Sequence, residues 1–127
     1  MTNIQQVHSN AAPQAIGPYS QAIKTGSLVF LSGQIPLNPE TMEIVSGGIA
    51  AQTHQVFSNL IAVAEAAGGS LANAVKLTIY VTDLGDFATV NEIMAEYFSE
   101  PYPARATIQV SALPKGSIVE IDAVLSL

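Results

Sequence analysis

A helix pattern that runs directly into a strand pattern constrains the fold of this chain more than any other feature. In residues 49–67 apolar side chains recur at helical spacing, and Gly68-Gly69 supplies a stop. In residues 75–82 apolar and more polar side chains alternate, which is typical of a strand with one buried face. Because the helix and the strand each have a single apolar side, we expect them to pack against each other.

Two short extended runs precede this unit, at residues 20–25 and 28–32. The Gly26-Ser27 pair between them predicts a hairpin. Residues 33–48 are rich in proline and glycine, which is the composition of a loop.

A second amphipathic helix is predicted after the strand. Asp83 and Asp86 are its candidate N-caps, and Pro101 and Pro103 end it. Its apolar stripe comprises Phe87, Val90, Met94, Tyr97 and Phe98. Two more strands follow, at residues 106–110 and 118–125. The order β-β-α-β-α-β-β predicts an α+β fold in which both helices cover one face of a mixed sheet.

Alternation assigns faces to the two tail strands. One face is apolar on each strand and is expected to pack under the helices; it comprises Ala106, Ile108 and Val110, and Val119, Ile121, Ala123 and Leu125. The opposite faces carry Arg105, Thr107, Gln109, Glu120 and Asp122. We therefore expect these polar side chains to lie on the side of the sheet away from the helices.

Length and composition narrow the class of protein. The 127 residues suit one domain, 1–127, with one hydrophobic core. The absence of cysteine excludes disulfides and thiolate chemistry. The first ten residues do not resemble a signal peptide, and Glu65 and Lys76 interrupt the most apolar stretch, so no membrane span is expected. A soluble, cytoplasmic protein is the expectation.

The charge balance bears on partners. Four Lys and Arg residues face ten Asp and Glu residues, for a formal net charge of -6. A nucleic-acid binder is disfavoured, because such affinity grows with the number of phosphates that Lys and Arg neutralise. With 49% hydrophobic and only 11% charged residues, part of the surface is expected to be buried in an oligomer.

Arg105 is the sharpest candidate for function. It is the only arginine of the chain and follows Pro101-Tyr102-Pro103-Ala104. A guanidinium presents a planar two-point fork for a carboxylate, which lysine cannot imitate. The alternatives are a surface arginine or an ion-pair partner of Glu120.

Glu120 is the second candidate, since a carboxylate among strand residues can position water or move a proton. The alternative is an exposed strand residue. Tyr19 follows a constrained Gly-Pro turn, and the backbone at Ser32-Gly33 could approach a ligand. Phe87 and Asn91 share one helix face. Most tyrosines and glycines in such settings are structural, and Phe87 is otherwise expected to lie in the core.

Metal and cofactor motifs are missing from the sequence. His8 and His54 have no neighbouring ligand at metal spacing, and His54 falls on a polar helix face with Gln52, Gln55 and Ser58, where we expect it to be solvated. The glycine pairs do not extend into a dinucleotide or phosphate-loop motif. We expect neither a metal nor an organic cofactor.

Five segments together carry a family resemblance. They are Ala15-Ile16-Gly17-Pro18-Tyr19-Ser20-Gln21, Ser32-Gly33-Gln34-Ile35-Pro36, Asp86-Phe87-Ala88-Thr89-Val90-Asn91, Pro103-Ala104-Arg105, and Leu113-Pro114-Lys115 followed by Glu120. In this order and spacing the chain resembles the RidA family of reactive intermediate deaminases, also called the YjgF family, over nearly its whole length.

The resemblance implies a chorismate-mutase-like fold and a homotrimer with three clefts between subunits. It implies that Arg105 binds the substrate carboxylate and that Glu120 holds the attacking water. Tyr19, named with them as a catalytic residue, and Ser32-Gly33 would line the pocket. Phe87 and Asn91 would come from the neighbouring subunit. Thr107, where archetypal members carry cysteine, would join the substrate-binding residues.

The activity implied is that of a 2-iminobutanoate/2-iminopropanoate deaminase. Such an enzyme hydrolyses the 2-imino acids formed after pyridoxal-phosphate dehydratases release enamines, and it yields 2-keto acids and ammonia. Two alternatives stay open: a non-catalytic sensor of small 2-keto or amino acids, and a nuclease or translation inhibitor, which fits poorly with the charge of the chain.

Overall fold

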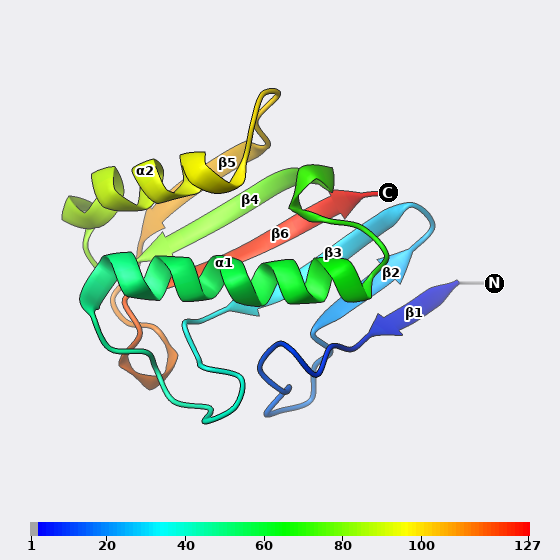
Figure 1. The fold of residues 1–127 in the computed structure, drawn as a ribbon, viewed down its shortest axis with the longest axis horizontal. Helices are drawn as coiled ribbons and strands as arrows, with labels where there is room; N and C mark the ends of the chain where they lie inside the picture. Colours follow the sequence, from blue (N-terminus) through cyan, green and yellow to red (C-terminus); the bar gives the residue numbers. More distant parts are fainter. Residues whose placement is uncertain (1–2) are drawn as a thin grey trace.

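The computed structural model describes residues 3–127, which form a six-stranded sheet with two α-helices (Figure 1). The strands are β1 (Ile4–Val7), β2 (Ala22–Thr25), β3 (Leu28–Gln34), β4 (Ala74–Val81), β5 (Ala104–Gln109) and β6 (Val119–Ser126). Their order across the sheet is β1-β2-β3-β6-β4-β5. β4 and β5 pair in parallel and the other neighbours are antiparallel, so the predicted mixed sheet is confirmed.

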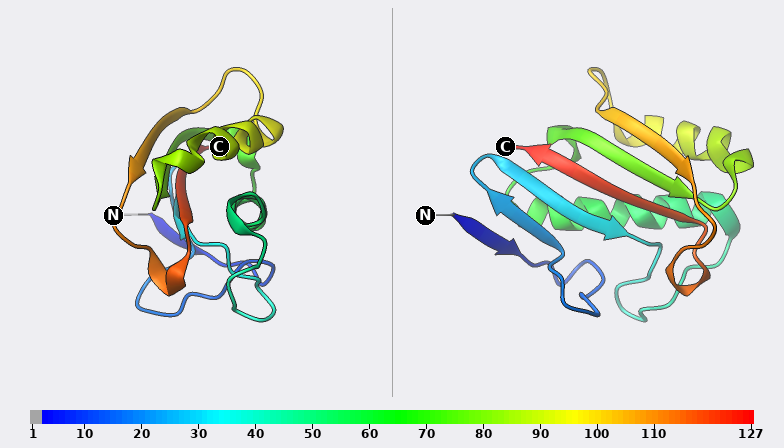
Figure 2. Two further views of the ribbon diagram at one scale, coloured as in Figure 1. Left: turned by 90° about the vertical axis from the view of Figure 1, so that its left-hand side faces the viewer. Right: turned by 180° about the vertical axis from the view of Figure 1, so that it is seen from behind.

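Both helices, α1 (Gly48–Ala66) and α2 (Phe87–Tyr97), lie on one face of the sheet, as predicted (Figure 2). The core lies between them and the sheet, and Phe57, Leu60, Ile79, Ile121 and Leu125 are among its fully buried side chains. α1 ends where the glycine pair predicts: Gly68 has φ 94°, and the amides of Gly68 and Gly69 donate to carbonyls of the last helical turn. The α+β class and the hairpin at residues 22–34 are therefore confirmed.

The N-terminal strand β1 was not among the predicted elements. Its sequence, Ile-Gln-Gln-Val, has no alternation, and only Val7 is buried. β1 lies at the edge of the sheet against β2, where backbone pairing rather than apolar burial holds it. The order is therefore β-β-β-α-β-α-β-β.

Short 3₁₀ turns refine the predicted caps. Asp83 caps the turn η2 (Leu84–Asp86) by accepting from the Gly85 amide, whereas Asp86 occupies the N-cap position of α2 without a side-chain bond. Two further turns, η1 (Leu71–Asn73) and η3 (Pro114–Gly116), precede β4 and β6. In the described residues no helix is long and apolar enough to cross a membrane.

The face predicted for β6 is confirmed, but that for β5 is wrong. Val119, Ile121, Ala123 and Leu125 are buried, and Glu120 and Asp122 point away from the helices. On β5, however, Arg105 pairs beside buried Leu77 and Thr107 beside buried Ile79, so both point toward the helix side. Ile108 lies beside Tyr80 on the outer face and is 45% exposed. The parallel register with β4 determines which side chains of β5 face the helices. Polar side chains can point to the helix side here because β5 is an edge strand and α2 presents the polar Asn91 to it.

Candidate functional site

Arg105 lies in a group of side chains from α2. Its Nη1 donates to Asn91 Oδ1 at 2.6 Å and lies 3.6 Å from Met94 Sδ. Its guanidinium carbon lies 5.2 Å from the centre of the Phe87 ring, which is a cation–π contact. Positions 87, 91 and 94 share one face of α2, so the helix presents all three to the end of β5.

The partners of Arg105 are an amide oxygen, a thioether and a ring, none of which carries a negative charge. The interpretation of Arg105 as a partner of Glu120 within the chain is therefore wrong. The guanidinium borders a cavity of about 480 Å³, lined by Asn91, Met94, Ala95, Tyr102, Pro103 and Arg105. A carboxylate entering this cavity would meet an uncompensated fork of donors.

Thr107 points to the same side of β5 as Arg105, two residues further along. Its hydroxyl oxygen is buried and has no hydrogen-bond partner. A buried hydroxyl without a partner is unfavourable, so the hydrogen bonding of Thr107 is incomplete within the chain.

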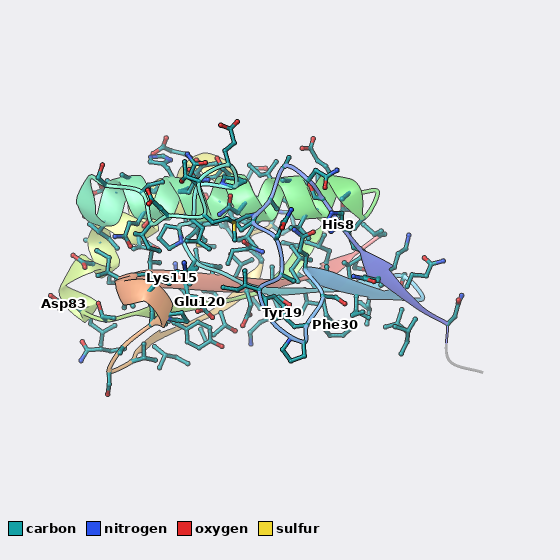
Figure 3. The ribbon with its side chains drawn as sticks, turned by 90° about the horizontal axis from the view of Figure 1, so that it is seen from below. His8, Tyr19, Phe30, Asp83, Lys115 and Glu120 are labelled. Atoms are coloured by element: carbon teal, nitrogen blue, oxygen red, sulfur yellow. The ribbon has the colours of Figure 1, made fainter. Side chains whose placement is uncertain are left out.

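Glu120 lies in a second group, on the outer face of the sheet near the end of β3 (Figure 3). From Leu31 to Gln34 the β3 register advances three residues while its partner β6 advances two, from Ala123 to Ile121, which marks a bulge at Ser32-Gly33. A Cβ added to Gly33 would overlap Glu120 Oε2 and lie 3.0 Å from its Cδ. Gly33 is therefore required for the carboxylate to lie against the bulge.

The cavity beside Glu120 has a volume of about 400 Å³. It is lined by Pro13, Gln14, Ile16, Tyr19, Ser32, Gly33, Gln34, Ile35, Leu37, Pro114 and Glu120. The structure therefore brings four residues predicted for the site into one place: Tyr19, Ser32, Gly33 and Glu120.

Hydrogen bonds fix the loop that carries Tyr19. The Ser32 hydroxyl donates to the Ser20 carbonyl at 2.6 Å, so its proton is committed to the loop. Buried Gln21 donates to the Pro13 carbonyl at 2.8 Å and accepts from the Ser9 amide at 2.6 Å. The Tyr19 ring remains half exposed at the cavity.

Burial raises the pKa of Glu120, and the neighbouring carboxylate of Asp122 raises it further. Asp122 in turn accepts a hydrogen bond from Tyr80 Oη at 3.1 Å. Burial, followed by the charge of Asp122, also raises the pKa of Tyr80, so the phenol stays a proton donor. A carboxylate with a raised pKa is a stronger proton acceptor once it is ionised.

The two groups face opposite sides of the sheet in one chain. Arg105, Thr107, Phe87 and Asn91 lie on the helix side, whereas Glu120 lies on the outer face. The two cavities share no lining residue. Phe87 and Asn91, expected from a neighbouring subunit, contact Arg105 within the same chain, so relative to Arg105 that expectation is wrong.

Several polar residues have roles that the sequence did not indicate. His54, expected to be solvated, makes a 2.7 Å hydrogen bond through Nδ1 with Tyr97 Oη, which links α1 to α2. Gln52, also assigned to the exposed helix face, is buried. Met94 belongs to the group around Arg105, and Asp122 belongs to the group around Glu120. In residues 3–127 no three His, Asp or Glu side chains are grouped to hold a metal ion.

Comparison with known proteins gives consistent matches over almost the whole chain. A family model described as endoribonuclease L-PSP matches residues 9–126. The protein DfrA of Myxococcus xanthus is 58% identical over 120 residues, which cover 93% of this chain and 92% of that protein. The human 2-iminobutanoate/2-iminopropanoate deaminase is 48% identical over 122 residues, covering 95% and 89%.

A solved structure agrees with these matches. The crystal structure of RidA from the Antarctic bacterium Psychrobacter sp. PAMC 21119 has a TM-score of 0.94 and 52% sequence identity. The match covers 97% of this chain and 99% of that one. The fold that the family resemblance implies for a single chain is therefore confirmed.

The contact between Gly33 and Glu120 leads to a first prediction. In Gly33→Ala the new methyl group should displace the flexible carboxylate from its buried position rather than unfold the chain. The raised pKa of Glu120 should then fall toward its ordinary value, measured by NMR titration, while the melting temperature changes little. Gly17→Ala is the control, because a Cβ there meets only ordinary contacts with Tyr19. An unchanged Glu120 titration in Gly33→Ala would contradict the proposed fit.

Proposed function

Because the chain belongs to the endoribonuclease L-PSP family, which includes RidA, we propose that it hydrolyses small 2-imino acids to 2-keto acids and ammonia. The observation that carries this proposal is Arg105, a guanidinium at a cavity whose contacts in the chain are all neutral. The name of the human relative supports 2-iminobutanoate and 2-iminopropanoate as substrates.

The chemistry needs two functions from the protein. Arg105 anchors the carboxylate of the imino acid through two parallel hydrogen bonds, with the Thr107 hydroxyl available to donate a third. Glu120 accepts a proton from a water molecule as the water oxygen bonds to the C=N carbon, and it passes this proton to the nitrogen, which is left as an amine on the hydroxylated carbon. The hydroxyl proton of this adduct then moves to the amine nitrogen by way of Glu120, the C–N bond breaks, and the keto acid and ammonia are released. Since imines also hydrolyse unaided, orientation and proton transfer suffice.

A second copy of the chain brings the two groups together in this proposal. Arg105 and Glu120 face opposite sides of the sheet, so the substrate carboxylate and the attacking water are held by different subunits. Support comes from the outer face, which no helix covers (Figure 2). On this face Phe30 is 47% exposed and Ile108 is 45% exposed. Burial of such side chains favours association. We propose the homotrimer that the family resemblance implies, with one site at each subunit boundary.

The principal test of this function is Arg105→Lys. Lysine keeps the charge but not the planar fork, and a small misplacement of the reacting carbon costs on the order of 10²-fold in rate. Imine hydrolysis should therefore be nearly abolished, measured as keto acid released from a dehydratase-generated imine. Light scattering on the same preparation should still give three times the chain mass, with the melting temperature preserved.

Four outcomes would contradict this assignment. Retention of more than about half of the wild-type activity would show that a point charge suffices. Loss of activity through dissociation would make Arg105 an assembly residue. Keto-acid binding by a wild-type protein that does not accelerate imine hydrolysis would favour a sensor, and RNA cleavage that persists in Arg105→Ala would favour a nuclease.

Glu120→Gln separates proton transfer from binding. We expect turnover to fall about tenfold or more while keto-acid affinity changes little, because the amide is nearly isosteric but accepts protons poorly. The pKa of Glu120 is raised in the folded chain, so its ionisation costs stability as pH rises through that pKa. The variant should therefore melt no lower than wild type at neutral pH, and any gain should shrink as the pH is lowered toward the ordinary pKa of glutamate. Unchanged turnover would make Glu120 a structural residue.

Thr107→Val tests the unpartnered hydroxyl. Valine has nearly the same shape, and removing a buried hydroxyl without a partner should leave the melting temperature equal or higher. If the hydroxyl donates to the bound ligand, keto-acid affinity should fall about three- to tenfold, the loss of one hydrogen bond. Calorimetric titration measures this affinity, and unchanged binding would remove Thr107 from the site.

A further inference from the structure

Three polar side chains form a stripe along α1, and two of them are buried against the loops beside the sheet. Gln52, Gln55 and Asn59 are three and four residues apart, which places them on one side of the helix. Asn59 is 1% exposed and Gln52 is also buried. Burial of an amide side chain is costly unless the amide is hydrogen-bonded. The hydrogen-bond partners of Gln52 and Asn59 therefore identify the segments that these two residues hold in place.

Asn59 is hydrogen-bonded to the backbone of the segment that follows β3. Its Nδ2 donates to the carbonyls of Ile35, at 3.2 Å, and Leu37, at 3.0 Å. Its Oδ1 accepts from Gln55 Nε2 at 2.9 Å, so the whole amide is satisfied. Ile35 and Leu37 line the Glu120 cavity directly after the Gly33 bulge.

Gln52 is hydrogen-bonded to the backbone of the segment that precedes β6. Its Oε1 accepts from the backbone amide of Ile118 at 3.0 Å, two residues before Glu120. The Ile118 carbonyl accepts from the Thr82 amide at 3.3 Å, which ties the same residue to the end of β4. One helix therefore holds both the wall of the Glu120 cavity and the base of the strand that bears the carboxylate.

We infer that Asn59 and Gln52 are positioning residues, which hold the wall of the cavity and Glu120 at a fixed separation. Neither side chain lines the cavity, so each acts through the backbone that it binds. A helix is stiffer than the proline- and glycine-rich loop of residues 35–47, and three hydrogen bonds from one side of it fix both segments in a common frame. The catalytic part of this inference rests on the proposed imine hydrolysis.

Two substitutions of nearly unchanged shape test it. Asn59→Asp removes both donors to Ile35 and Leu37 while it keeps the acceptor for Gln55. Gln52→Met removes the acceptor for Ile118 and introduces no charge. Thr53→Val is the matched control, because Thr53 is equally buried on the same helix and its hydroxyl donates only to Ile49 within that helix.

The expected kinetic result is a fall in kcat of about tenfold or more in each variant, with KM within about threefold of wild type, because the carboxylate anchor at Arg105 is untouched. The assay is run well below the melting temperature and normalised to folded trimer. Thr53→Val should keep the wild-type kcat even where its melting temperature falls. A lower melting temperature with unchanged kcat in both test variants would show a purely structural role and overturn the inference. Equal loss of kcat in Thr53→Val would overturn it as well.

A structural measurement distinguishes this inference from the proposed function. In the crystal structure of Asn59→Asp, residues 35–37 should shift relative to residues 118–120. In that of Gln52→Met, residues 118–120 should shift relative to residues 35–37. In both structures the contact between Gly33 and Glu120 should change. The amide of Ile118 should exchange its hydrogen faster in Gln52→Met. Absence of imine hydrolysis in wild type would refute the proposed function. In that case the crystal structures and the hydrogen exchange of Ile118 would still decide whether the two residues position these segments. Unmoved segments with unchanged exchange would refute the positioning role whatever the activity.

Discussion

In the parallel pairing of β4 with β5, Leu77 lies beside Arg105 and Ile79 beside Thr107, and the arrangement of the site depends on this register. Leu77 and Ile79 are fixed toward the helices because they are fully buried in the core. Their neighbours on β5 must then point the same way, which delivers the guanidinium to Phe87 and Asn91 of α2. The antiparallel pairing of β4 with β6 places Glu120 beside Tyr80, on the other side of the sheet. Apolar burial on two central strands thus determines where both charged groups lie.

The carboxylate and the guanidinium are held in contrasting ways. Arg105 is exposed and touches only neutral groups, so its charge is free to attract an anion. Glu120 is partly buried, lies beside Asp122 and rests on a glycine, so its negative charge is disfavoured and its position is confined. One group is suited to binding a carboxylate and the other to accepting a proton. That contrast follows from burial and neighbouring charge, independently of any family resemblance.

The sequence predicted the elements with clear periodicity, and the residues that it singled out as site candidates fall into two groups in the structure. Both α-helices and the buried side of β6 followed from apolar spacing, because packing between a helix and a sheet requires that spacing. The hairpin followed from the Gly26-Ser27 pair between two extended runs. Alternation on β5 showed that Arg105 and Thr107 share a face, but it could not say which face the helices cover, since Ile108 is as apolar as a core residue. β1 has no apolar pattern, and backbone pairing alone places it in the sheet. In the sequence Gln52 falls on the polar helix face and Asn59 was not singled out, because the partners of both are backbone groups of loops whose course depends on the whole fold.

The division of the polar groups between two faces of one sheet has a consequence for heterozygous assemblies. In the proposed cyclic trimer each boundary takes its guanidinium from one subunit and its carboxylate from the next. A chain defective at Arg105 still offers a sound carboxylate, and a chain defective at Glu120 still offers a sound guanidinium. In any trimer that contains both kinds of chain, one subunit boundary combines an intact Arg105 with an intact Glu120. Two inactive alleles expressed together would therefore complement each other, and every mixed ring would recover one working boundary.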